Sequence, residues 1–147
     1  SSITSNDTVL RLIKKIVPKT QSNVVMDIQF NNALSSDRNS AVIESSAFSF
    51  IDDEGNIHEL SKIEDDQSGN LRVYSYVNAQ KTIHKNNVGT VDYETGVLAL
   101  SGLRVSSYAN HIALYAKLLN KDIVINKDSI LIIEPEDVSV TIKATVS

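Results

Sequence analysis

The chain has 147 residues, of which 41% are hydrophobic and 22% charged, and its formal net charge is −4. This length is typical of one domain, and because there is no cysteine the sequence excludes disulfides, thiolate catalysis and thiolate-bound metal centres. The acidic balance argues against a general nucleic-acid binder, and no apolar run approaches the roughly 18 residues of a membrane span.

The N-terminal segment has the pattern of an amphipathic helix. Ser5, Asn6 and Asp7 can cap it, and Pro18 can end it. Apolar residues recur on one helical face: Val9, Leu10, Leu12, Ile13, Ile16 and Val17. We therefore predict a helix over residues 7–17, which either packs on the domain core or binds a partner.

The central region, residues 42–105, has the patterns of strands and hairpins, and a strand precedes it where apolar residues alternate from Val24 to Phe30. Phe48–Ile51 and Ile57–Leu60 flank a turn, Asp52–Asn56, which predicts a first hairpin. A second acidic turn leads into a predicted strand, Leu71–Val77, and a polar connection follows it.

The strongest hairpin signal lies in Val88–Val105. Two β-prone runs, Val88–Asp92 and Val97–Ser101, flank a short connection that ends at Gly96. Glycine can adopt the positive φ that closes such a loop, where a side chain would be strained.

The C-terminal region predicts further strands over residues 110–146. The segment 109–119 fits either a helix or a strand by periodicity, and its β-rich neighbours favour a strand. Ile123–Ile125, Ile130–Ile133 and Val138–Val146 complete the pattern, with a turn at Glu134–Asp137. The predicted fold class is α+β: one mainly antiparallel, hairpin-rich domain over residues 1–147 with a single N-terminal helix.

Charge is distributed unevenly along the chain. Basic residues dominate the first 19 positions, and acidic residues dominate from Glu44 to Asp66. We interpret the acidic residues as solvated loops; steering of a partner is the alternative.

The search for chemistry finds no catalytic motif. The turn Asp52–Asn56 lacks the ligand spacing of a calcium loop. His58, His84 and His111 are not spaced as zinc ligands, and Asp92 and Glu94 are better explained as turn residues than as a glycosidase pair. We predict no enzyme activity, no cofactor, no metal and no small-molecule substrate.

Three stretches of the sequence together resemble a known family. They are Val-Val-Met-Asp-Ile-Gln-Phe, Phe-Ser-Phe-Ile-Asp-Asp-Glu-Gly-Asn-Ile-His-Glu-Leu and Val-Gly-Thr-Val-Asp-Tyr-Glu-Thr-Gly-Val-Leu-Ala-Leu. They are similar to the C-terminal part of the baseplate wedge protein of T-even-like contractile-tailed bacteriophages. The resemblance implies a structural virion protein that forms homodimers and joins neighbouring tail proteins into a ring. At this length the chain would be a portion of such a subunit, or a reduced relative.

These expectations place the protein in the phage tail baseplate, assembled in the host cytoplasm, with itself and other baseplate proteins as partners. The predicted partner-contact residues are Tyr74, Tyr76, Tyr93 and Arg104. The alternative function is a non-catalytic carbohydrate-binding or adhesin module, which the tyrosines allow and the absence of tryptophan weakens.

Overall fold

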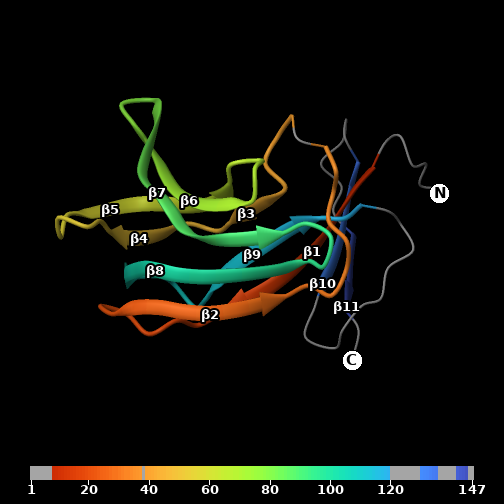
Figure 1. The fold of residues 1–147 in the computed structure, drawn as a ribbon, viewed down its shortest axis with the longest axis horizontal. Coiled ribbons are helices and arrows are strands. Elements are labelled where there is room, and N and C mark those ends of the chain that lie inside the picture. Colours follow the sequence, from red (N-terminus) through yellow and green to blue (C-terminus); the bar gives the residue numbers. More distant parts are fainter. Residues whose placement is uncertain (1–7, 38, 120–129, 136–141, 146–147) are drawn as a thin grey trace.

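The computed structural model describes residues 8–37, 39–119, 130–135 and 142–145, and all regular structure in these ranges is β-strand (Figure 1). The strands are β1 (Thr8–Ile16), β2 (Asn23–Gln29), β3 (Ile43–Ser45), β4 (Phe48–Ile51), β5 (Ile57–Asp65), β6 (Asn70–Val77), β7 (Gln80–Asp92), β8 (Val97–Ser107), β9 (Ile112–Lys117), β10 (Ile130–Pro135) and β11 (Ile142–Thr145).

The strand pairings are antiparallel and close a five-stranded barrel. β4 pairs with β5, β5 with β6, β6 with β7, β7 with β8, and β8 returns to β4. From β5 the sheet continues outward through β3, β9, β1 and β10 to β11, and β2 pairs with β8. The ring removes free edges from the centre of the sheet, and the remaining strands form a wing beside it.

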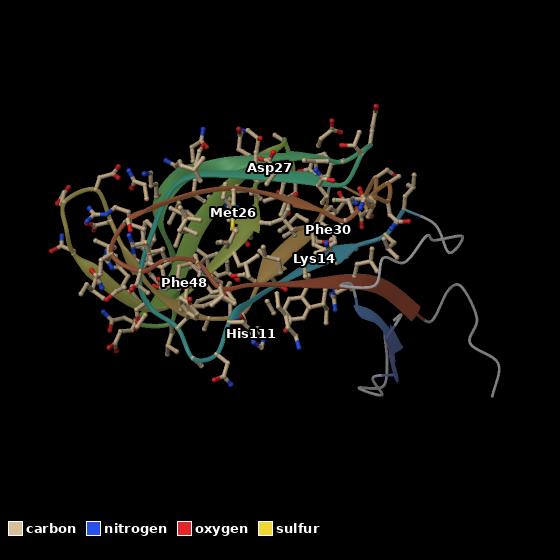
Figure 2. All side chains as sticks on the ribbon, turned by 90° about the horizontal axis from the view of Figure 1, so that it is seen from below. Lys14, Met26, Asp27, Phe30, Phe48 and His111 are labelled. Carbon is tan, nitrogen blue, oxygen red and sulfur yellow. The ribbon has the colours of Figure 1, made fainter. Side chains whose placement is uncertain are left out.

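One continuous apolar cluster joins the wing to the barrel. It includes Leu12 of β1, Ile28 of β2, Phe50 of β4 and Leu98 of β8, and side chains fill the space that the strands enclose (Figure 2). The alternation expected for Val24–Phe30 is confirmed, because Val24, Ile28 and Phe30 are buried while their neighbours Val25, Asp27 and Gln29 are exposed. Period-two burial of this kind holds a strand in one register.

The predicted N-terminal helix is wrong, and with it the α+β fold class. Residues 8–16 form β1, which pairs with β9 on one edge and β10 on the other. Leu12 and Ile16 belong to the main apolar cluster, whereas Ile13 packs with Ala113 in a second cluster. A central strand buried on both faces lacks strict alternation, so its apolar residues also fit a helical period.

The predicted hairpins are confirmed where their turns carry a local signal. Phe48–Ile51 and Ile57–Leu60 lie in the paired strands β4 and β5, and Val88–Val105 contains the β7–β8 hairpin. Gly96 has φ 74°, and a Cβ there would stand 2.2 Å from the Asn32 carbonyl oxygen. Glycine at this turn is therefore required both by the backbone and by the adjacent chain.

One hairpin was missed. The stretch expected as a polar connection after Val77 is the first half of β7, which starts at Gln80 and pairs back onto β6. The two-residue turn consists of Asn78 (φ 52°) and Ala79 (φ 65°). Two left-handed residues make the mirror-image turn that suits the twist of a hairpin, but alanine is an unusual choice for it.

The predicted C-terminal strands are confirmed where the described residues cover them. The turn predicted at Glu134–Asp137 is wrong at its start, because Glu134 and Pro135 are the last residues of β10 and pair with β1. The ambiguous segment 109–119 contains strand β9, and Ile130–Ile133 lies in β10. β11 covers part of the predicted strand Val138–Val146. Ile123–Ile125, and the end of the turn predicted at Glu134–Asp137, lie outside the described residues.

Candidate interaction surface

Four large apolar side chains are exposed on β5 and β6. Ile57 is 58% exposed, Leu60 77%, Tyr76 66% and Val77 46%. We call this set the hairpin surface. Ile57, Tyr76 and Val77 border an open hollow of about 530 Å³, and Leu60 borders a second hollow of about 380 Å³. Glu59 lines both hollows, so the two hollows are adjacent.

The hairpin surface exists because β5 and β6 pair over only part of their length and then separate. They pair only from Lys62 to Asp65, opposite Leu71 to Tyr74. Before Lys62, β5 pairs with β4; after Tyr74, β6 continues with β7 into a projecting hairpin (Figure 1). Ile57, Tyr76 and Val77, which border the first hollow, have no strand of the described chain to cover them. Leu60 borders the second hollow, beside β4 and the end of β8.

Leu60 is held outward by an irregularity in the β4–β5 pairing. The register shifts between Phe48 and Phe50, and Leu60 has φ 55°, a left-handed conformation that is uncommon outside glycine, asparagine and aspartate. The hydroxyl of Ser61 donates to the His58 carbonyl oxygen at 2.9 Å across this bend. A large apolar residue in a strained, exposed position is a feature that folding alone does not require.

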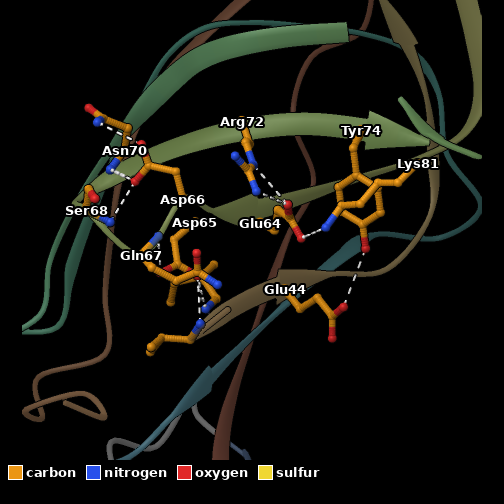
Figure 3. Close-up of polar contacts among 12 residues, drawn as sticks. Glu44, Glu64, Asp65, Asp66, Gln67, Ser68, Asn70, Arg72, Tyr74 and Lys81 are labelled. Atoms are coloured by element: carbon orange, nitrogen blue, oxygen red, sulfur yellow. Dashed lines mark hydrogen bonds and ion pairs between the residues drawn. The ribbon is translucent and has the colours of Figure 1, made fainter. Parts of the chain in front are cut away.

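A buried carboxylate anchors the base of the β6–β7 hairpin (Figure 3). Glu64 of β5 is 3% exposed, and its Oε2 accepts hydrogen bonds from Arg72 at 2.8 and 2.9 Å. Its Oε1 accepts one from Lys81 Nζ at 2.8 Å. A buried carboxylate without partners would be strongly destabilising, so these two cations hold β6 and β7 against β5.

The predicted contact residues Tyr74 and Tyr76 lie side by side, but they differ in exposure. Their rings meet edge to face with centroids 6.0 Å apart. Tyr74 is buried: its hydroxyl donates to Glu44 Oε1 at 3.4 Å, and Lys81 Nζ lies 4.5 Å from its ring centroid. Burial, and then the carboxylates of Glu44 and Glu64, raises the pKa of Tyr74 to about 12. Tyr76 is the exposed one of the pair.

The other two predicted contact residues stand elsewhere. Tyr93 is in the β7–β8 turn, and its hydroxyl donates to Asp65 Oδ2 at 2.6 Å. Arg104 is half-buried on β8, opposite Asn23 of β2. Partner binding by these four residues stays a prediction, but burial and internal hydrogen bonds give Tyr74 and Tyr93 structural roles. Sequence reasoning missed Ile57, Leu60 and Val77, because their exposure depends on where the strands separate.

The residues considered for metal binding form other arrangements. In the turn Asp52–Asn56, Asp52 Oδ1 accepts the backbone N–H groups of Glu54 and Asn56 at 2.9 Å, as a turn-forming side chain does. His58 and His84 stack on each other, and His111 precedes β9. Among the described residues, no group of three or more His, Cys, Asp or Glu side chains could hold a metal ion.

A scan against protein-family models and searches of curated proteins and solved structures gave no match. The described segments include no helix with the length and apolar character that crossing a membrane would need.

Proposed function

We propose that this chain is a structural subunit of a contractile phage tail, a baseplate wedge component that dimerises and joins neighbouring tail proteins into a ring. The observation that carries the structural role is the hairpin surface. Clustered, exposed apolar side chains around a hollow are characteristic of protein–protein contacts, and tyrosine is enriched at their centres. The assignment to a phage baseplate rests on the sequence resemblance.

Within this proposal, we assign the hairpin surface to contact between two copies of the chain. A twofold contact brings the same patch of both copies together, so each apolar residue is used twice. Leu60 has the largest exposed fraction of the four and would enter the hollow of the facing copy. The other baseplate proteins would then bind the remaining faces of the dimer.

The test is native mass measurement over a concentration series for the wild-type chain and Leu60→Asp. Aspartate tolerates the left-handed backbone at this position better than leucine, so folding should be preserved. Loss of a central apolar contact should weaken the dimer by about 2 kcal/mol, or roughly thirtyfold in Kd.

Val25→Asp is the matched control, because Val25 is 78% exposed on β2, away from the hairpin surface. A dimer that resists Leu60→Asp, or dissociates equally with Val25→Asp, would contradict the assignment of this surface. A monomer at every concentration would contradict the homodimer itself.

The alternative, a non-catalytic carbohydrate-binding module, has one observation in its favour. Tyr76 is exposed beside the hollow of about 530 Å³, and aromatic rings beside hollows are common platforms for sugars. A glycan array that gives signals abolished by Tyr76→Ala would support this function over assembly, and an array with no signal would exclude the glycans tested.

A further inference from the structure

Two half-buried histidines on strands that are not paired with each other lie face to face beside the open hollow of about 530 Å³. The rings of His58 on β5 and His84 on β7 stack with centroids 3.7 Å apart and planes inclined by 17°. His58 Nε2 donates to Asp52 Oδ2 at 2.7 Å, while His84 Nε2 and Ser75 Oγ lie 2.6 Å apart. The stack therefore bridges the β4–β5 and β6–β7 hairpins directly.

The outer part of the β6–β7 hairpin depends on few contacts. Beyond Tyr74 and Ile83 its strands pair with each other, and an isolated two-stranded hairpin is marginal in water. In the described part of the chain, the hairpin is held against the β4–β5 hairpin by the ion pairs of Lys81 with Glu64 and of Lys85 with Asp53 and, at its base, by the histidine stack.

We propose that the His58–His84 stack is a proton-operated latch: it holds the β6–β7 hairpin against the β4–β5 hairpin and releases it when both rings are protonated. Two cations at stacking distance repel each other, whereas one protonated ring over a neutral one does not. Release would widen the gap beside Tyr76 and so reshape the hairpin surface.

Several charged groups surround the stack. The carboxylate of Asp52 faces His58, with its Oδ2 2.7 Å from the His58 Nε2. Glu59 lines the adjoining hollow, and on β7 the cation of Lys85 is taken up by Asp53 Oδ1 at 3.0 Å and the Gly102 carbonyl oxygen at 2.9 Å. Burial and then the neighbouring His58 lower the pKa of His84. The latch is thus closed near neutral pH and opens in mild acid.

The test is amide hydrogen exchange at about pH 7.5 and about pH 5, a range that brackets histidine titration. Rates are expressed as protection factors, which removes the intrinsic pH dependence of exchange. Protection over residues 75–83 should fall about tenfold in acid. Protection in β1 and β9 should not change.

Two variants separate the latch from general acid sensitivity. His84→Phe keeps a flat ring in the stack but cannot be protonated, so its hairpin should stay protected at both pH values. His111→Gln removes the third histidine and should behave as wild type. Equal loss of protection in wild type and His84→Phe, or no loss in wild type, would overturn the latch.

If His84→Phe does not fold, NMR titration of the imidazole rings in the wild-type chain tests the latch instead. Coupled titration of His58 and His84, with the second proton binding more weakly than the proton of His111, supports the latch. Independent titration of the two stacked rings overturns it.

Discussion

The variant Tyr93→Phe removes one hydroxyl and tests how much the hydrogen bond between the β7–β8 turn and β5 contributes to stability. The Tyr93 hydroxyl donates to Asp65 Oδ2 at 2.6 Å and accepts from the backbone N–H of Gly69 at 3.2 Å. Asp65 is fully buried, and its Oδ1 accepts the N–H groups of Val42 and Ile43 at 2.7 and 2.9 Å. The substitution leaves the ring in place and removes the shortest bond to this carboxylate.

The expected loss of stability follows from these contacts. A hydrogen bond to a charged group contributes about 1.5–3 kcal/mol, and the half-buried N–H of Gly69 also loses its acceptor. Asp65 Oδ2 retains only a long bond, 3.3 Å, from the Gln67 N–H among the described contacts. We therefore expect Tyr93→Phe to lower the free energy of unfolding by about 2–3 kcal/mol.

Urea denaturation at one fixed, low protein concentration measures this change. With a typical urea dependence for a small domain, the midpoint should fall by about 1–2 M without a change in slope. Tyr76→Phe is the matched control: its ring is 66% exposed, and the variant should stay within about 0.5 kcal/mol of wild type. An unchanged midpoint for Tyr93→Phe would refute the view that Asp65 depends on this hydroxyl.

Three further predictions concern the turns and the dependence on pH. Ala79→Gly should raise the free energy of unfolding by about 0.5–1 kcal/mol in urea denaturation, because Ala79 occupies φ 65°; a loss would show that the turn is not strained. Gly96→Ala should lower it by more than about 2 kcal/mol in the same assay, since the new Cβ meets the Asn32 carbonyl and φ is 74°; near-wild-type stability would mean that this loop shifts freely. Burial lowers the pKa of His84, so the unfolded chain binds more protons than the folded one; thermal stability should be complete above about pH 6.5 and fall below it. The hydrogen bond from His58 lowers the pKa of Asp52 to about 2. The stability that Asp52 contributes is therefore complete above its unfolded-state pKa of 3.8 and is lost as pH falls toward about 2. Thermal stability that does not change with pH in either the His84 or the Asp52 range would contradict these two assignments.

The sequence predicts strands and hairpins well where the determining residues are close together. The turn at Gly96 and the turn after Ile51 carry their own chemistry, so both hairpins could be found without a structure. The turn Asn78–Ala79 has the required backbone but lacks the glycine that usually signals it, and the β6–β7 hairpin was therefore missed.

The helix predicted for residues 7–17 failed for a different reason. Its apolar spacing satisfies a helical period, and no neighbour in sequence contradicts it. What makes this segment a strand is pairing with β9 and β10, which lie far along the chain. Tertiary partners override local propensity, and one sequence read alone does not supply them.

The candidate surface was still harder to foresee. Residue type alone points to Tyr76, but it points equally to Tyr74 of the same strand, which is buried, and it does not distinguish Leu60 from an ordinary strand residue. Exposure there follows from the point at which β5 and β6 separate, which is a property of barrel closure.

The acidic residues from Glu44 to Asp66, interpreted as solvated loops, include the two that organise the barrel. Glu64 and Asp65 are adjacent on β5 and both buried, so their side chains leave the strand on opposite faces. Glu64 binds cations on β6 and β7, while Asp65 binds the segment before β3 and the β7–β8 turn. Burial of each carboxylate is tolerated only when its hydrogen-bond and ion-pair partners are in place. Strand pairings in the wrong register would leave a buried charge unpaired, and they are therefore disfavoured.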